Sequence, residues 1–240
     1  MQNSSYNRRT NSPSRRNSRN QRGRRSKKMQ KMYRIRIMMC VAFAMLLILL
    51  VYTGTSVVRY VKAEKKNLTE PEIDVELLDI NEYSRPGIAL DQVNGIVVHY
   101  TANPGTTAMQ NRNYFNGLKD SHETKASAHF IIGLDGEIVQ CIPTAEIAYA
   151  SNDRNADTVS IECCIEDDTG EFNEATYDSL VELTTYLMGK FDLDSEDVIR
   201  HYDVTGKLCP KYYVEHEDAW EQFKVDLDDY IEEYGEKVVE

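Results

Sequence analysis

An uncharged, apolar segment of 22 residues, 37–58, most strongly constrains how this 240-residue chain can fold. A helix needs roughly 20 apolar residues to cross the hydrocarbon core of a bilayer, so this segment is long enough for one span. A cleaved signal peptide is the alternative, but its apolar run is usually about 7–15 residues long. The tripeptide 61–63 is also a weak cleavage site. We therefore predict an uncleaved transmembrane helix over residues 37–58, with secretion as the alternative.

Charge is divided unevenly on the two sides of this segment. Residues 1–36 hold 13 of the 28 Lys and Arg and none of the 39 Asp and Glu, so the remainder is strongly acidic. Basic residues before a span favour a cytoplasmic N-terminus, which places residues 59–240 outside the cell. We expect 1–36 to be a disordered cytoplasmic tail near anionic lipid headgroups, or alternatively a docking tail for nucleic acid or a cytoplasmic partner. The acidic remainder is not expected to bind nucleic acid.

The rest of the chain is predicted to contain a polar linker, 59–71, and one folded domain, 72–240. Its apolar patterns alternate between the strand and helix types. Strands are predicted at 96–100, 128–133, 138–142 and 158–165, with a hairpin turn at 135–136, and helices at 108–118, 177–191 and 220–234. We therefore expect an α/β fold with a mixed central β-sheet flanked by helices.

The segment HYDVTGKLCP, residues 201–210, carries the strongest chemical signal. His201 follows a short apolar run, and Cys209 comes eight residues later, after a turn at Thr205-Gly206. A loop of that length can bring an imidazole and a thiolate onto one ion, and zinc accepts both ligand types. His99, on the first strong strand, is the natural candidate for a third ligand. Three protein ligands leave one tetrahedral position open for water, as in catalytic zinc sites.

Five motifs cover nearly the whole predicted domain. They are SRPG (84–87), NGIVVHYTANPG (94–105), SAHFIIGLDGEIVQCIP (127–143), TVSIECCI (158–165) and HYDVTGKLCP (201–210). In this order and at these separations they resemble the type 2 N-acetylmuramoyl-L-alanine amidase family, which shares its fold with the peptidoglycan recognition proteins. The resemblance runs from about Glu72 to Lys224. It implies a zinc hydrolase that cleaves the amide between the lactyl group of N-acetylmuramic acid and L-alanine in peptidoglycan.

The resemblance also implies which residues bind the metal and which residue lines the substrate cleft. His99, His201 and Cys209 match the family's ligands for Zn2+. His129 matches a histidine that lines the cleft, which implies substrate binding, with a purely structural role as the alternative. Some relatives carry a tyrosine immediately before this histidine, where this chain has Ala128. More of the catalytic work is therefore expected to fall on a glutamate.

That glutamate is Glu162, which matches a carboxylate placed beside the metal in many bacterial members. We expect Glu162 to take a proton from water and deliver it to the departing amine. Lys207 matches a lysine two residues before the cysteine ligand, and its charge would stabilise the developing oxyanion. The alternatives are a solvated strand carboxylate and a surface lysine.

Three other functions remain as alternatives. A cysteine-nucleophile hydrolase would use Cys163 or Cys164, but alternation along the strand places Cys163 in the core and no histidine partner is evident for Cys164. A membrane-tethered sensor would bind muropeptide without cutting it. A zinc endopeptidase would cut within the stem peptide. The expected partners are peptidoglycan and, through the anchor, membrane lipid. A regulatory partner is reasonable, although no residue marks one.

Overall fold

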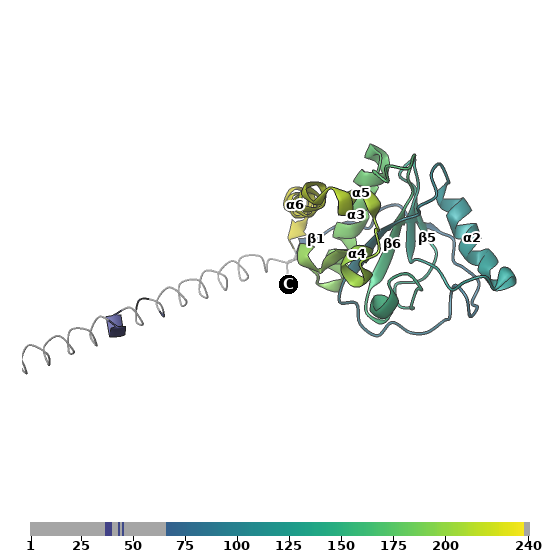
Figure 1. The fold of residues 1–240 in the computed structure, drawn as a ribbon, viewed down its shortest axis with the longest axis horizontal. Coiled ribbons are helices and arrows are strands. Elements are labelled where there is room, and N and C mark those ends of the chain that lie inside the picture. Colours follow the sequence, from purple (N-terminus) through teal and green to yellow (C-terminus); the bar gives the residue numbers. More distant parts are fainter. Residues whose placement is uncertain (1–36, 40–42, 44, 46–65, 238–240) are drawn as a thin grey trace, which may run out of the picture. The chain divides into compact units, whose positions relative to one another are not determined.

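The computed structural model describes residues 37–39, 43, 45 and 66–237 (Figure 1). The chain divides into two compact units, Met1–Ala63 and Glu64–Glu240, and the fold described below is that of the second. The predicted tail and most of the predicted span lie outside the described residues. Among the described residues, no helix is both long and apolar enough to cross a membrane.

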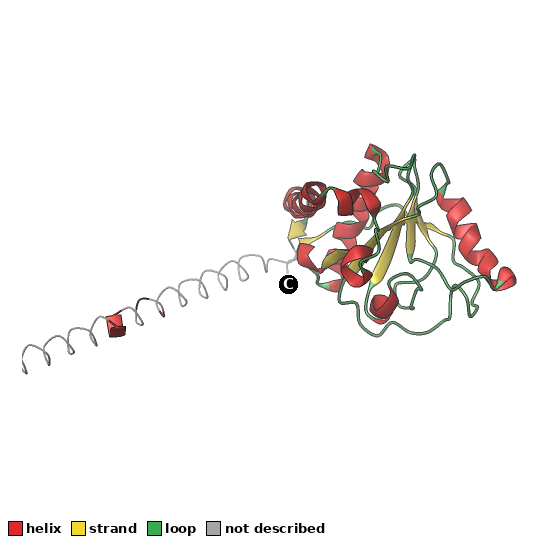
Figure 2. Ribbon diagram, in the orientation of Figure 1, coloured by secondary structure: helices red, strands yellow, loops and turns green. Residues whose placement is uncertain are grey.

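A six-stranded mixed sheet forms the centre of the second unit (Figure 2). Its strands are β2 (Asp74–Val75), β3 (Ile96–Tyr100), β4 (Phe130–Ile132), β5 (Ile138–Gln140), β6 (Val159–Cys163) and β7 (Val198–Arg200). They lie in the order β2-β5-β4-β6-β3-β7. The hairpin pair β4/β5 is antiparallel, and the other four pairs are parallel. The predicted α/β fold with a mixed central sheet is thereby confirmed.

The helices connect these strands and cover the sheet. They are α2 (Ala108–Ser121), α3 (Glu174–Phe191), α4 (His201–Thr205), α5 (Lys211–Glu215) and α6 (Glu217–Tyr234), with 3-10 turns η1 (Asn152–Ala156) and η2 (Ser195–Asp197). Asn173 caps α3: its side chain accepts a hydrogen bond from the backbone N–H of Thr176. Such caps satisfy donors that the first helical turn leaves unpaired.

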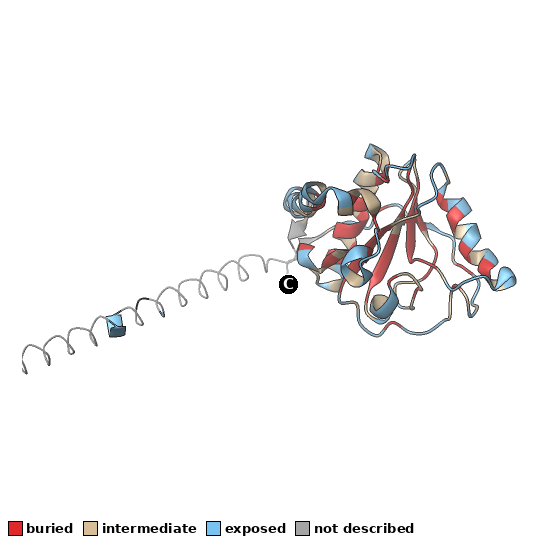
Figure 3. Cartoon of the chain, in the orientation of Figure 1, coloured by how far each residue is buried: buried red, intermediate tan, exposed pale blue. Residues whose placement is uncertain are grey.

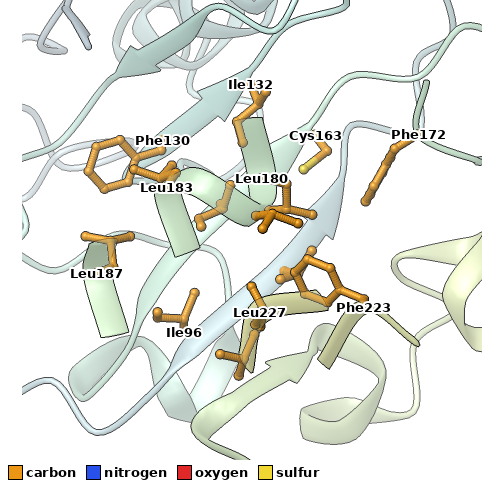
Figure 4. Close-up of a cluster of buried hydrophobic side chains, with 14 of the residues drawn as sticks. Ile96, Phe130, Ile132, Cys163, Phe172, Leu180, Leu183, Leu187, Phe223 and Leu227 are labelled. Atoms are coloured by element: carbon orange, nitrogen blue, oxygen red, sulfur yellow. The ribbon is translucent and has the colours of Figure 1, made fainter. Parts of the chain in front are cut away.

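One face of the sheet packs against α3 and α6 (Figures 1 and 4). Ile96, Ile161 and Cys163 are fully buried there, together with Leu180 of α3 and Phe223 of α6. Burying each large apolar side chain contributes about 1.5–3 kcal/mol. The predicted core position of Cys163 is confirmed, because alternation along β6 directs every second side chain to this layer.

The opposite face of the sheet packs against α2, through Ala108, Phe115 and Leu118. These contacts form a second, smaller apolar layer, and the sheet between the two layers is buried on both faces (Figure 3). Strand alternation places His99 of β3 and Glu162 of β6 on this second face, because their neighbours Val98 and Ile161 belong to the first. The face of the sheet that α2 covers therefore carries His99 and Glu162.

The described fold begins earlier than the predicted boundary at residue 72. A two-residue strand β1 (Lys66–Asn67) pairs antiparallel with β8 (Glu236–Lys237). Pro71 is buried, and the carboxylate of Glu70 accepts a hydrogen bond from Tyr186 of α3. The last part of the predicted linker, residues 66–71, thus belongs to the folded unit. Strands of two residues carry no readable alternation, which is why the sequence did not reveal them.

Candidate metal centre

The carboxyl ends of three parallel strands bring the site together. His99 of β3 and Glu162 of β6 are paired in register, on strands that run about 4.8 Å apart. His201 is the first residue after β7, which pairs with β3 on its other side. Parallel sheets gather functional groups at this edge because all their strands end there. The structure therefore unites residues that are about 100 positions apart in the sequence.

A short helix and a loop carry Cys209 back to His201. Gly206, at φ 76°, ends α4 in the left-handed conformation that glycine adopts without steric cost. The backbone N–H of Tyr202 then donates to the carbonyl of Cys209 at 2.9 Å, which closes the loop. The turn at this glycine was predicted from the sequence, but the helical turn before it was not.

Arg200 fixes the start of α4. Its guanidinium is buried and pairs with Asp203 at 2.9 Å and with Glu217 at 2.7 Å. It also donates to the carbonyl of Tyr213 at 2.8 Å. A bidentate, buried arginine holds its partners in one geometry. The strand end that presents His201 is therefore rigidly attached to the helices behind it.

The side chains of His99, His201 and Cys209 converge on one point. One ligand atom from each lies within 4.8 Å of the others, and all three residues are buried. Cys209 Sγ is 3.8 Å from His99 Nδ1. Ligand atoms on one tetrahedral zinc ion lie roughly 3.4–3.6 Å apart, as follows from bond lengths of about 2.0–2.3 Å. The three predicted ligands are thus close to the spacing that a zinc ion requires.

The hydrogen bonds of the two imidazoles indicate which atoms face the metal position. His99 Nε2 lies 3.2 Å from Ser151 Oγ, and His201 Nε2 lies 2.9 Å from Asn152 Oδ1. His201 Nδ1 is buried and has no hydrogen-bond partner within the described part of the chain. An unsatisfied buried nitrogen is costly, and a metal ion would satisfy it. Both histidines therefore offer Nδ1 as the ligand atom.

Burial sets the protonation states of these ligands. It lowers the pKa of His99 well below its ordinary value, and the positive charge of Lys207 acts in the same direction. Burial also lowers the pKa of His201. Both rings are therefore neutral at pH 7, which is the form that binds metals. Burial raises the pKa of the Cys209 thiol to about 12, so a bound cation would have to displace its proton.

Glu162 lies next to the ligands in an environment that changes its acidity. Burial raises the pKa of its carboxyl to about 8, while the charge of Lys207 acts in the opposite direction. Its Oε2 atom is buried, with no hydrogen-bond partner in the region that the structure describes. Lys207 itself is exposed at the loop between α4 and Cys209. A carboxyl with a pKa near neutrality can both accept and return a proton.

A cavity of about 350 Å3 opens beside Glu162. Its other lining residues are Thr101, Asn103, Gln110, Asn111, Tyr114 and Phe115, all uncharged. Thr101 Oγ1 is buried, and it too lacks a hydrogen-bond partner among the described residues. Two of the residues that line this cavity, Thr101 and Glu162, thus each carry an unsatisfied side-chain oxygen. Sequence reasoning did not single out Thr101, which stands two residues after a ligand on the same face of the chain.

His129 is buried and fully hydrogen-bonded. The backbone N–H of Ser160 donates to its Nδ1 at 3.0 Å, so the proton of the neutral ring is on Nε2. Nε2 lies 2.9 Å from the carbonyl oxygen of Glu146 and donates to it. Burial lowers the pKa of His129 to about 4, which keeps the ring neutral. With 1% of its surface exposed and both nitrogens engaged, the ring is not available to a ligand, and the structural alternative is favoured over substrate binding.

We predict that His129→Ala lowers the free energy of unfolding by about 1–3 kcal/mol, because it leaves the N–H of Ser160 and the carbonyl of Glu146 buried without partners. Urea denaturation of the variant and the wild-type protein measures the difference. A variant with unchanged stability but weaker binding of muropeptide would restore the substrate-binding role.

Cys163 and Cys164 are unsuited to act as nucleophiles. Both are free thiols and fully buried. Burial raises the pKa of Cys163 well above its ordinary value and that of Cys164 to about 12. Cys164 Sγ accepts a hydrogen bond from the side-chain amide of Asn111 at 3.6 Å. Since the thiolate is the reactive form, neither residue supports a cysteine-nucleophile mechanism.

Solved structures share this fold. The catalytic domain of PlyG is 25% identical, with a TM-score of 0.57 covering 66% of this chain and 94% of that domain. A mutant endolysin from Bacillus subtilis is 26% identical, with a TM-score of 0.54 covering 65% of this chain and 99% of the endolysin.

Curated proteins and a family model agree with the structural match. N-acetylmuramoyl-L-alanine amidase CwlL of Bacillus licheniformis is 35% identical over 173 residues, 67% of this chain and 47% of CwlL. The chain thus spans about half the length of the curated relatives it matches. The family model for N-acetylmuramoyl-L-alanine amidases matches residues 89–212, a stretch that contains His99, Glu162, His201 and Cys209. On this match, the chain belongs to the type 2 N-acetylmuramoyl-L-alanine amidase family.

Proposed function

We propose that this chain is a zinc-dependent hydrolase that cleaves the amide between the lactyl group of N-acetylmuramic acid and L-alanine in peptidoglycan. The convergence of His99 Nδ1, His201 Nδ1 and Cys209 Sγ beside Glu162 carries this proposal. Two neutral nitrogens and one sulfur form a donor set that suits zinc, and three ligands leave a position open. The family membership supports the choice of substrate and bond.

Zinc held by these three residues would supply a Lewis acid that polarises the amide carbonyl and makes water a stronger nucleophile at neutral pH. Glu162 is placed to accept the proton that water loses as its oxygen bonds to the carbonyl carbon. The same carboxyl then gives that proton to the departing nitrogen as the C–N bond breaks. The products are a lactyl carboxylate and a stem peptide with a free N-terminal amine.

Lys207 contributes positive charge near the reacting atoms. Its charge lowers the pKa values of His99 and Glu162, which indicates that its field reaches the site. Because the side chain is exposed on a loop, it can follow the substrate oxygen on which negative charge develops. We assign it to oxyanion stabilisation.

The cavity beside Glu162 is the proposed place for the substrate groups that flank the scissile amide. Apart from Glu162 its lining is uncharged, and Tyr114 offers an aromatic ring that is 51% exposed. Such a lining suits amide and hydroxyl groups, which the N-acetyl sugar and the start of the stem peptide both carry.

We predict that Thr101→Val lowers kcat/KM for a soluble muropeptide about 3–10-fold, because it removes one hydrogen bond from hydroxyl to substrate without changing side-chain volume. Thr101→Ser keeps the hydroxyl and should retain activity near the wild-type value. Steady-state kinetics on the two variants decides the point. Loss of activity in Thr101→Ser with wild-type activity in Thr101→Val would mean that the methyl group matters and the hydroxyl does not.

Digestion of purified peptidoglycan by the full-length chain tests the proposed function. Products are resolved by mass spectrometry, with parallel digestions by Glu162→Ala protein and by chelator-treated protein. Release of whole stem peptides that begin with free L-alanine, lost in both controls, is the expected result. Activity that survives chelation would contradict the zinc dependence.

Two other outcomes correspond to the alternatives. Shortened stems that lack N-terminal alanine would move the cut to a peptide bond and indicate an endopeptidase. Retention of muropeptide with no cleavage would indicate a binding protein.

We also propose that residues 37–58 anchor the protein in the cell membrane, with residues 1–36 cytoplasmic and the amidase domain outside. The length and lack of charge of this segment and the basic residues before it support the proposal. Protease added to intact protoplasts should remove the amidase domain and spare the N-terminal tail. Release of the protein by alkaline carbonate would contradict membrane insertion.

A further inference from the structure

One short segment contacts both histidines of the candidate metal centre. Ser151, which is fully buried, reaches His99 Nε2 at 3.2 Å. The next residue, Asn152, reaches His201 Nε2 at 2.9 Å. His99 lies on β3 and His201 directly follows β7, so residues 151–152 at the start of η1 bridge two separate strands on the side away from the metal position.

These contacts determine which nitrogen of each ring is left for a metal. A neutral imidazole carries one N–H and one lone pair. When Nε2–H donates to Ser151 Oγ or Asn152 Oδ1, the lone pair is on Nδ1. His99 Nδ1 lies beside Cys209 Sγ, and His201 Nδ1 is the buried nitrogen without a partner in the described region. In both rings the lone pair on Nδ1 is therefore left for a metal ion.

The segment is itself held in an uncommon conformation. Asn152 has φ 53°, in the left-handed region that L-residues rarely adopt and that asparagine adopts more readily than most. Asn155 Oδ1 accepts hydrogen bonds from the backbone N–H groups of Ala150 at 3.0 Å and Ser151 at 2.6 Å, which stabilises the turn. A sparsely populated conformation persists where the surroundings enforce it, and such positions cluster at functional sites.

We propose that Ser151 and Asn152 are positioning residues that hold His99 and His201 with Nδ1 toward the metal. The inference rests on the proposed zinc centre. Outer hydrogen-bond partners of metal-binding histidines fix the ring orientation, and their loss typically lowers metal affinity about 10–100-fold. Neither residue has a charge, a metal-binding group or a place in the catalytic steps. Ser151 and Asn152 therefore influence metal binding only through the orientation of His99 and His201.

Zinc affinity of the purified full-length chain, measured by competition with a chromophoric chelator, tests this inference. Asn152→Gly removes the amide but tolerates the left-handed backbone, and Ser151→Ala removes the hydroxyl. Each is expected to weaken zinc binding about 10–100-fold. Asn152→Asp keeps an acceptor for His201 and should bind within a few-fold of the wild-type protein. Asp192→Gly, at another left-handed position (φ 61°) after α3, is the matched backbone control and should leave zinc affinity unchanged.

The visible absorption of the cobalt-substituted proteins gives a second readout, since it reports ligand geometry directly. Altered bands in Asn152→Gly and Ser151→Ala, with wild-type bands in Asn152→Asp, are expected. Wild-type affinity and spectra in both Asn152→Gly and Ser151→Ala would overturn the positioning role while leaving the zinc centre intact. Absence of zinc binding by the wild-type chain would overturn the centre and this inference together.

Discussion

Glu162→Gln should lower kcat by about 10²–10⁴-fold, the usual contribution of a general acid–base residue. The amide keeps the size of the carboxyl but can neither accept a proton from water nor return one to the leaving amine. Because Glu162 is adjacent to the metal ligands and is not one of them, zinc content should stay at the wild-type level. Steady-state kinetics on muropeptide, with zinc measured by elemental analysis, checks both statements.

The control for this variant is Glu123→Gln, which changes an exposed glutamate just after α2 and should leave kcat unchanged. Loss of zinc from Glu162→Gln would contradict the assigned role, since it would make Glu162 a ligand. A decrease in kcat of less than about tenfold would mean that another group carries out the proton transfer.

Cys209→Ser should weaken zinc binding by more than about 100-fold, because it removes a direct ligand and loss of an outer partner alone costs about 10–100-fold. The hydroxyl oxygen that replaces the sulfur is a much poorer zinc ligand than a thiolate. Bound zinc stabilises the folded state, by about 2.7 kcal/mol at a concentration 100 times Kd. Zinc should therefore raise the Tm of the wild-type protein and leave that of Cys209→Ser nearly unchanged.

Cys141→Ser is the matched control, because Cys141 is an equally buried free thiol that lies in the apolar layer under α2. It should retain zinc affinity and the shift of Tm with zinc, even if its own stability decreases. Equal zinc affinity in Cys209→Ser and wild-type protein would exclude the sulfur as a ligand.

The chemistry of the site could be predicted from sequence because it depends on residue types that are rare in strands. His99 stands in an otherwise apolar run, and alternation along β6 placed Glu162 opposite the core residues Ile161 and Cys163. His201 and Cys209 were linked by their spacing and by the resemblance. Each of these signals is local in the sequence, so it can be recognised without knowledge of the tertiary contacts.

The partners of these residues could not be predicted in the same way. Ser151 and Asn152 lie in a polar stretch typical of any turn, and their contacts depend on strands about 50 residues away in either direction. The hydrogen bonds of His129 were hidden for a related reason. Its motif position gave no information that Ser160 and Glu146 occupy both ring nitrogens. Long-range hydrogen bonds of this kind produce no periodic pattern of residue types in the sequence.

The pairing of β1 with β8 places the two ends of the folded unit on adjacent strands, about 4.8 Å apart. A unit whose ends meet can be inserted into, or attached to, longer chains of different architecture without distortion of its interior. The candidate metal centre, at the carboxyl ends of β3, β6 and β7, is built entirely from residues between those ends. Such a unit is modular, which fits its match to only 47% of the length of CwlL.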